Sequence, residues 1–190
     1  LLVPEINLTP QLEARVAARF PEAGLVSLHS ELTEAARTRN WRAAFDGRAR
    51  LVLGTRLAVF TPMPELGLII VDEEHDASFK QQDGMRYSAR DVAVFRARQL
   101  GIPVLLGSAT PSLESWANAQ GRRYTLLNLR ERANPAAMLP AVDLLDTRKM
   151  VLKEGVSEPL IAAIKERLAR GEQSLVFLNR RGYAPVLTCT

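Results

Sequence analysis

The segment Asp72–Asp76 reads Asp-Glu-Glu-His-Asp and follows directly after the apolar run Leu68–Val71. Carboxylates this close together repel one another unless a cation or a proton donor lies among them. In an open parallel sheet, ligands bind beyond the carboxyl ends of the strands. In phosphoryl-transfer sites, a carboxylate after such a strand holds Mg²⁺ and another group orients or deprotonates the attacking water. The segment therefore indicates Mg²⁺-assisted phosphoryl chemistry, with a solvated acidic loop as the alternative.

Three further segments carry small, hydroxyl or charged residues directly after apolar runs: Gly107–Pro111, Gly54–Arg56 and Pro4–Thr9. The alternative for Ser108 and Thr110 is that they only cap the start of the next helix, a role that Thr110 fits well. Each segment alone is weak evidence for a binding site. Because the carboxyl ends of parallel strands meet at one edge of a sheet, the four segments together predict a single polar rim. A metal nuclease is disfavoured, since its carboxylates converge from several elements and these lie in one run.

The apolar runs that would form the strands alternate with helical patterns along the chain. The runs are Leu1–Val3, Leu25–Leu28, Leu51–Leu53, Leu66–Val71 and Pro103–Leu106. Consecutive apolar positions are typical of strands that are covered on both faces. Their alternation with helices predicts an α/β fold with a parallel sheet.

Start and stop signals predict helices over residues 10–20, 89–100, 111–120 and 158–170. Residues 130–156 contain Asn134-Pro135 and Leu139-Pro140 without clear periodicity, which is typical of a linker. Residues 174–178 are apolar enough to form a strand. One helix and one strand cannot bury a core of their own, so the sequence predicts a first domain over residues 1–129, a linker over 130–156 and the start of a second domain over 157–190.

Composition excludes several classes of protein. The chain has 190 residues, a net charge of +4 and one cysteine, Cys189. A single cysteine excludes an intramolecular disulfide framework and suits a reducing compartment. No apolar run approaches the roughly 20 residues that span a bilayer, and no signal peptide opens the chain. The chain starts without Met and stops after a strand-like run, so we expect an internal piece of a longer cytoplasmic protein.

Several strings, in collinear order, resemble the superfamily 2 DNA helicases, and in particular the bacterial primosomal protein N′ family of replication-restart helicases. Asp72–His75 and Gly107–Thr110 resemble motifs II and III of the superfamily. Five further strings resemble the primosomal family: Val3–Pro10, Gly54–Arg56, Phe60–Pro62, Lys80–Gln82 and Phe177–Pro185. The resemblance covers essentially the whole chain. It implies a three-layer RecA-like lobe of the P-loop NTPase type that lacks its first strand and its P-loop, followed by the start of a second lobe.

The resemblance also implies a role for each candidate residue. Asp72 would hold Mg²⁺ of bound ATP, and Glu73 would position the hydrolytic water. His75, Ser108 and Thr110 would link the nucleotide site to the DNA groove, although an ordinary loop histidine is the alternative for His75. The residues that would contact DNA are those of motifs Ia, Ib and IV and of the aromatic-rich loop: Pro4, Glu5, Thr9, Gly54, Thr55, Arg56, Phe79, Tyr87, Arg180 and Arg181. A basic surface turn is the alternative for Arg180 and Arg181.

Three departures limit what this chain would do alone. The aromatic-rich loop Phe79–Tyr87 carries Met85 where the family often has Trp, and Met is a poorer stacking platform. No Gly-Lys-Ser/Thr phosphate loop is present, and the family places it upstream of Leu1. Cys189 lies where the family begins a zinc-binding insertion, but one cysteine cannot complete a four-ligand Zn²⁺ site. We therefore expect the isolated chain to have no appreciable ATPase or unwinding activity.

The resemblance implies that the whole protein is an ATP-dependent DNA helicase that remodels stalled replication forks and starts primosome assembly. Its expected partners are single-stranded and forked DNA, single-strand-binding protein and primosome loading proteins. Two alternatives remain open: another superfamily 2 translocase of the branch-migration type, and, for the isolated chain, a DNA-binding module that needs no nucleotide. The residues beyond Thr190 would distinguish the first alternative from the replication-restart helicase. A salt-dependent DNA titration would test the second alternative.

Overall fold

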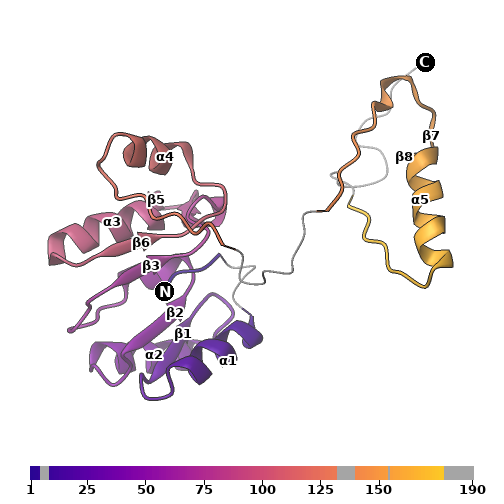
Figure 1. Ribbon diagram of the computed structural model, residues 1–190. Coiled ribbons are helices and arrows are strands. Elements are labelled where there is room, and N and C mark those ends of the chain that lie inside the picture. The colour runs from indigo at the N-terminus through magenta and orange to yellow at the C-terminus, as the bar shows by residue number, and fades with distance from the viewer. Residues whose placement is uncertain (5–8, 132–139, 154, 178–190) are drawn as a thin grey trace. The chain divides into compact units, whose positions relative to one another are not determined.

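The computed structural model describes residues 1–4, 9–131, 140–153 and 155–177. The chain divides into two compact units, Leu1–Asn128 and Leu129–Thr190, and each is described by itself (Figure 1). Within the described ranges, every helix is too short or too polar to cross a membrane.

A parallel sheet forms the centre of the first unit. Its strands are β1 (Leu25–Leu28), β2 (Leu51–Gly54), β3 (Ile69–Val71) and β6 (Val104–Leu106). β1 pairs with β2, and β3 pairs with β6. Leu2 joins the two pairs through parallel bridges to Gly54 and Val71. The order is therefore β1, β2, the Leu1–Val3 segment, β3 and β6 (Figure 1), which confirms the predicted α/β fold with a parallel sheet.

Four helices accompany this sheet: α1 (Pro10–Arg19), α2 (Glu34–Phe45), α3 (Ala89–Leu100) and α4 (Leu113–Gln120). α1 and α2 pack against β1, while α3 packs against β3 and β6. The predicted caps Thr9 and Ser88 are confirmed, since each side chain accepts a backbone N–H of the first helical turn. The prediction for Thr110 is wrong. α4 begins later, and Ser112 caps it by accepting the N–H of Ser115.

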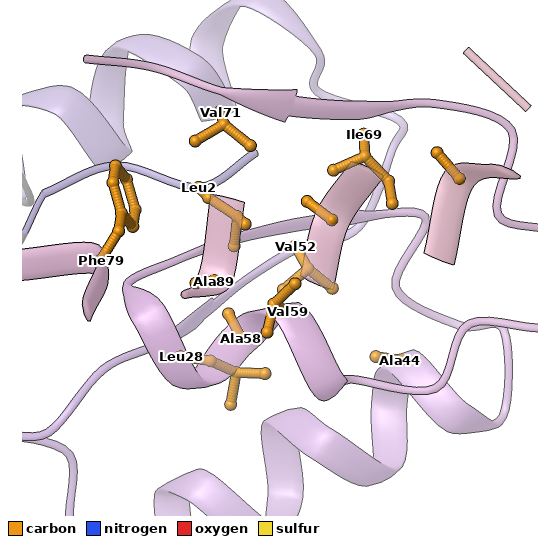
Figure 2. Packing of buried hydrophobic residues seen from close by; sticks show 12 residues of the cluster. Leu2, Leu28, Ala44, Val52, Ala58, Val59, Ile69, Val71, Phe79 and Ala89 are labelled. Atoms are coloured by element: carbon orange, nitrogen blue, oxygen red, sulfur yellow. The ribbon is translucent and has the colours of Figure 1, made fainter. Parts of the chain in front are cut away.

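The hydrophobic core combines side chains of the sheet with side chains of α2 and α3 (Figure 2). Ala89, Ala93 and Ala97 of α3 are almost completely buried. Residues four apart share one face of a helix, and these small side chains let α3 approach the sheet closely. Leu2 and Val71 belong to the same cluster, so the central strands and α3 share one core.

Short 3-10 helices and a hairpin connect these elements. They are η2 (Arg56–Phe60), η3 (Ala77–Phe79), β4 (Lys80–Gln81) and β5 (Tyr87–Ser88), the last two pairing antiparallel. Arg96 of α3 fixes the end of η2: its Nη1 donates to the carbonyl of Val59 at 2.6 Å and its Nη2 to that of Thr61 at 2.7 Å. η2 is thereby held against α3.

The second unit contains η4 (Thr147–Lys149), the hairpin β7 (Leu152–Lys153) and β8 (Val156–Ser157), and α5 (Glu158–Ala169). The predicted helix is confirmed, with Pro159 in its first turn. The predicted linker is more ordered than expected, because η4 and β7 lie within it. The predicted strand 174–178 is wrong over residues 174–177, which form no strand, and Leu178 lies outside the described residues. β7 and β8 pair with each other, and no described strand of this unit pairs with residues 174–177; a strand without a partner is not stable in water.

Candidate functional site

The acidic turn, Asp72–His75, follows β3 at the carboxyl edge of the sheet. Its backbone is fixed at both ends. The N–H of Asp72 donates to the carbonyl of Leu2 at 2.9 Å, and that of Glu74 donates to the carbonyl of Gly107 at 2.9 Å. Between them, Glu73 adopts φ +48°, a left-handed conformation that is strained for a residue with a side chain. Strained backbone of this kind is retained where the surroundings over-determine it, most often at functional sites.

The structure brings His75 into contact with Ser108 and Thr110, which lie 33 and 35 positions later in the chain. His75 Nδ1 lies 2.7 Å from Ser108 Oγ, and His75 Nε2 lies 3.4 Å from Thr110 Oγ1. Ser108 Oγ also accepts the N–H of Thr110 at 2.9 Å. Glu73 Oε2 is 3.6 Å from His75 Nδ1. A connected polar path therefore runs from Glu73 to the loop after β6.

Glu74 differs from its neighbours, because it turns into the protein and is only 3% exposed. Its Oε1 accepts the N–H of Ser112 at 2.7 Å. Its Oε2 accepts from Ser112 Oγ and Ser115 Oγ, both at 3.0 Å, and from Arg90 Nη1 at 3.2 Å. Burial by itself would raise the pKa of Glu74. The bonds from the two serines and from Arg90 outweigh burial and hold its pKa below the ordinary value.

Asp72 has the surroundings that a Mg²⁺ ligand needs. It is exposed, and its Oδ1 accepts one N–H, that of Glu73 at 3.1 Å. Gly107 lies beside it, where an added Cβ would stand 3.3 Å from Oδ1, so the glycine keeps this space open. Among the described residues no cluster of three or more His, Cys, Asp or Glu could hold a metal. One carboxylate fits an ion that takes its remaining ligands from phosphates and water, as Mg²⁺ does.

Three of the residues expected to contact DNA are buried in this structure. Pro4 is among the most completely buried side chains, and Thr55 is only 4% exposed. Gly54 lies inside the sheet, where an added Cβ would stand 2.4 Å from the Cβ of Ala58. Glycine is required here for packing, and none of the three presents a side chain at the surface. Thr9 remains exposed, with its hydroxyl used as the cap of α1.

Arg56, which was expected to contact DNA, makes hydrogen bonds within the protein. Its Nη1 donates to the carbonyl of Ser78 at 3.0 Å and to that of Lys80 at 3.2 Å. The preceding Asp76 begins η3, since its Oδ1 accepts the N–H of Ser78 at 2.7 Å. Hydrogen bonds from the side chain and the backbone N–H of Ser78 hold the pKa of Asp76 below its ordinary value. Arg56 therefore connects the segment after β2 to the segment after the acidic turn.

The aromatic-rich loop is also rearranged relative to expectation. Phe79 is only 1% exposed and belongs to the hydrophobic core (Figure 2). The ring of Tyr87 packs edge-on against Phe60 at a centroid distance of 5.0 Å, and its hydroxyl is buried without a hydrogen-bond partner among the described residues. The ring of Phe79 is not free to stack on a base in this conformation, and the half-buried ring of Tyr87 already contacts Phe60. The exposed apolar groups here are Phe60, at 46%, and Met85, at 71%.

The remaining predicted site residues cannot be placed. Glu5, Arg180, Arg181 and Cys189 lie outside the described residues. Their expected roles in DNA and Zn²⁺ binding stay predictions.

Residues 1–119 match the DEAD/DEAH box helicase family. The whole chain is also similar to curated proteins named replication restart protein PriA. Identity is 48% over 189 residues to that of Haemophilus influenzae, 45% over 193 residues to that of Bacillus subtilis and 46% over 195 residues to that of Chlamydia pneumoniae. Each match covers 100% of this chain and 24–26% of the relative. The chain therefore spans about a quarter of the length of these relatives.

Proposed function

Because this chain belongs to the DEAD/DEAH box helicase family, we propose that it is part of an ATP-dependent DNA helicase that restarts stalled replication. The observation that carries the proposal is the acidic turn with its attached polar path, which lies at the carboxyl edge of a parallel sheet. The similarity to replication restart proteins PriA over the whole chain supports the choice of pathway.

In this proposal the residues of the turn divide the work of ATP hydrolysis. When bound, Mg²⁺–ATP supplies the reacting phosphoryl group and the cation that neutralises its oxygens. Asp72 would hold the cation through its exposed carboxylate. Glu73 would orient the attacking water and accept its proton at Oε. His75 would transmit the state of Glu73 to Ser108 and Thr110, which it contacts directly.

DNA contact is assigned to exposed groups on the segments that follow the strands. Thr9 keeps its predicted place, and Phe60 and Met85 are the exposed apolar side chains beside the hairpin. Base stacking on such groups contributes about 1–3 kcal/mol per aromatic ring and does not depend on sequence. Single-stranded and forked DNA, single-strand-binding protein and primosome loading proteins are the proposed partners of the whole protein in the bacterial cytoplasm.

Several finer features belong to the same proposal. β6 pairs with β3 on one edge and, in the described part of the chain, with no strand on the other; Leu105 is 42% exposed. We assign this edge to a further strand that carries the phosphate loop, which is absent from the sequence. Residues 1–129 would form the first lobe and 157–190 the start of the second, with Cys189 as a Zn²⁺ ligand. The isolated chain would then lack ATPase activity.

Substitution of Glu73 in the full-length protein tests the proposal. Glu73→Gln keeps the size of the side chain but removes the base, so ATP should still bind while DNA-stimulated turnover falls at least about a hundredfold. Glu22→Gln, at an exposed carboxylate of the same lobe, is the matched control and should turn over normally. Normal hydrolysis by Glu73→Gln would remove Glu73 from the mechanism.

A nucleotide-independent DNA-binding module is the second candidate for the isolated chain, favoured by the missing phosphate loop. A titration of the chain with fluorescent single-stranded DNA at several salt concentrations separates the two. A module that grips phosphates loses affinity steeply as salt rises, whether or not ATP is present. Absence of binding at low salt would eliminate this candidate.

A further inference from the structure

Glu74 joins the acidic turn to the start of α4. The carboxylate is 1% exposed in its side chain, and Arg90 beside it is 11% exposed. It accepts four hydrogen bonds, and three come from Ser112 and Ser115 at the first turn of α4. A buried carboxylate is tolerated only when it is paired and hydrogen-bonded in this way.

This joint lies directly beside a strained residue. Glu73 has φ +48°, and a non-glycine residue in the left-handed region loses about 1–2 kcal/mol relative to the right-handed one. Such a conformation persists only where neighbouring contacts enforce it. The side chain of the next residue, Glu74, is the most firmly held group of the turn.

The acidic turn makes two separate contacts with the region from the loop after β6 to the start of α4, one exposed to solvent and one buried. On the outside, His75 meets Ser108 and Thr110 through exposed side chains. On the inside, Glu74 is bonded to Ser112 and Arg90 away from solvent. The hydrogen bonds of the outer contact can be replaced by bonds to water at small cost. Breaking the inner contact would leave several buried donors without an acceptor, which costs more free energy.

We propose that Glu74 is a positioning residue, whose buried carboxylate fixes the acidic turn on the first turn of α4 and so holds Glu73 in its left-handed conformation. Its catalytic consequence rests on the proposed function, because it requires Glu73 to orient the hydrolytic water. Its structural consequence does not, and the two are tested separately.

Glu74→Gln is the decisive variant because it keeps the shape of the side chain. Oε1 faces the N–H of Ser112, and Oε2 faces Nη1 of Arg90. Both partners can only donate. Whichever way the amide is turned, its nitrogen meets a donor, so the turn must shift to relieve the contact.

The structural test is a double-mutant cycle on the 190-residue chain, followed by urea unfolding. Glu73→Asn and Glu73→Ala both remove the carboxylate, but Asn tolerates the left-handed region better than Ala. With Glu74 intact, the Asn variant should have a folding equilibrium constant roughly fivefold larger than that of the Ala variant. Combined with Glu74→Gln, the ratio should fall below about twofold. An unchanged ratio would show that the backbone alone holds Glu73, and the proposal would fail.

The catalytic test uses the full-length protein under conditions where the variants stay folded. Glu74→Gln should lower kcat for DNA-stimulated ATP hydrolysis about tenfold and leave KM for ATP within about twofold. Arg90→Lys, which keeps a charged donor, should recover most of the kcat that Arg90→Met loses. A normal kcat in folded Glu74→Gln overturns the inference alone, whereas a normal kcat in Glu73→Gln overturns the proposed function.

Discussion

Phe79 separates two descriptions of the aromatic-rich loop, and its substitution tests which is right. The sequence predicts a ring that stacks on DNA bases. The structure instead buries the ring in the core, 1% exposed and in one cluster with Leu2 and Val71. The two descriptions make opposite predictions for Phe79→Leu and Phe79→Ala.

The magnitude follows from burial. A phenylalanine ring removes roughly 150–250 Å² from water, which at about 25 cal/mol per Å² corresponds to about 4–6 kcal/mol. Since the surroundings relax only in part, Phe79→Ala should lower the free energy of unfolding by about 3–5 kcal/mol. Phe79→Leu keeps most of the volume and should cost about 1–1.5 kcal/mol.

Urea unfolding of the 190-residue chain, followed by circular dichroism, measures both variants. Met85→Ala is the matched control on the same hairpin, because Met85 is 71% exposed and should change the free energy by no more than about 0.5 kcal/mol. Binding of fluorescent single-stranded DNA is measured in parallel on folded Phe79→Leu. A variant of unchanged stability that loses DNA affinity at least tenfold would refute the core assignment.

The remaining predictions concern the packing around the site. Gly54→Ala should lower the free energy of unfolding by about 1–3 kcal/mol, since the new Cβ would stand 2.4 Å from that of Ala58. Gly67→Ala is the control and should be neutral, because a Cβ there meets nothing within 4 Å. Equal urea midpoints for the two variants would contradict the prediction for Gly54. Arg96→Met leaves two carbonyls of the η2 segment without their donor, and should lower the thermal midpoint by an amount equivalent to about 2–3 kcal/mol. Asp76→Ala should cost about 1 kcal/mol at pH 7 through loss of the η3 cap. Because the pKa of this carboxyl is lowered on folding, its contribution to stability is present above the ordinary value of 3.8 and is lost as the pH falls through the folded pKa. A difference in stability from wild type that did not shrink as the pH was lowered below 3.8 would exclude this cause.

The strands could be predicted from the sequence because burial on both faces leaves an uninterrupted apolar run. The uninterrupted run Leu51–Leu53 becomes the strand Leu51–Gly54, in which three of the four residues are buried, whereas Leu25–Leu28 forms a strand although Ser27 interrupts its apolar run. The helix Glu34–Phe45 was not predicted. Only Ala44 is buried in it, so its sequence carries no apolar face for a periodicity to detect.

The site could be located but not resolved in detail. The contacts of His75 with Ser108 and Thr110 follow from strand ends that meet at one edge. Which carboxylate of the turn points inward depends on its backbone angles, and Glu74 looks no different from Glu73 in the sequence. No local pattern pairs it with Arg90, sixteen positions away.

The burial of several rim residues could not be predicted for a related reason. Small residues after a strand are needed for close packing as well as for binding, and the sequence cannot distinguish the two at Gly54 and Thr55. Arg56 likewise finds its partners, the carbonyls of Ser78 and Lys80, more than twenty positions away. Tertiary contacts of this range decide the role of each residue after the local pattern is set.

The place of Leu1–Val3 at the centre of the sheet has a consequence for how the first unit folds. Leu2 bridges Gly54 and Val71, which lie about fifty and about seventy positions away. The pairs β1–β2 and β3–β6 can therefore each form locally, but they join into one sheet only when the Leu1–Val3 segment inserts between them. Closing loops of this length is entropically costly and slows folding. We therefore expect removal of these three residues to leave two separate strand pairs and to abolish cooperative unfolding, although none of the three performs chemistry.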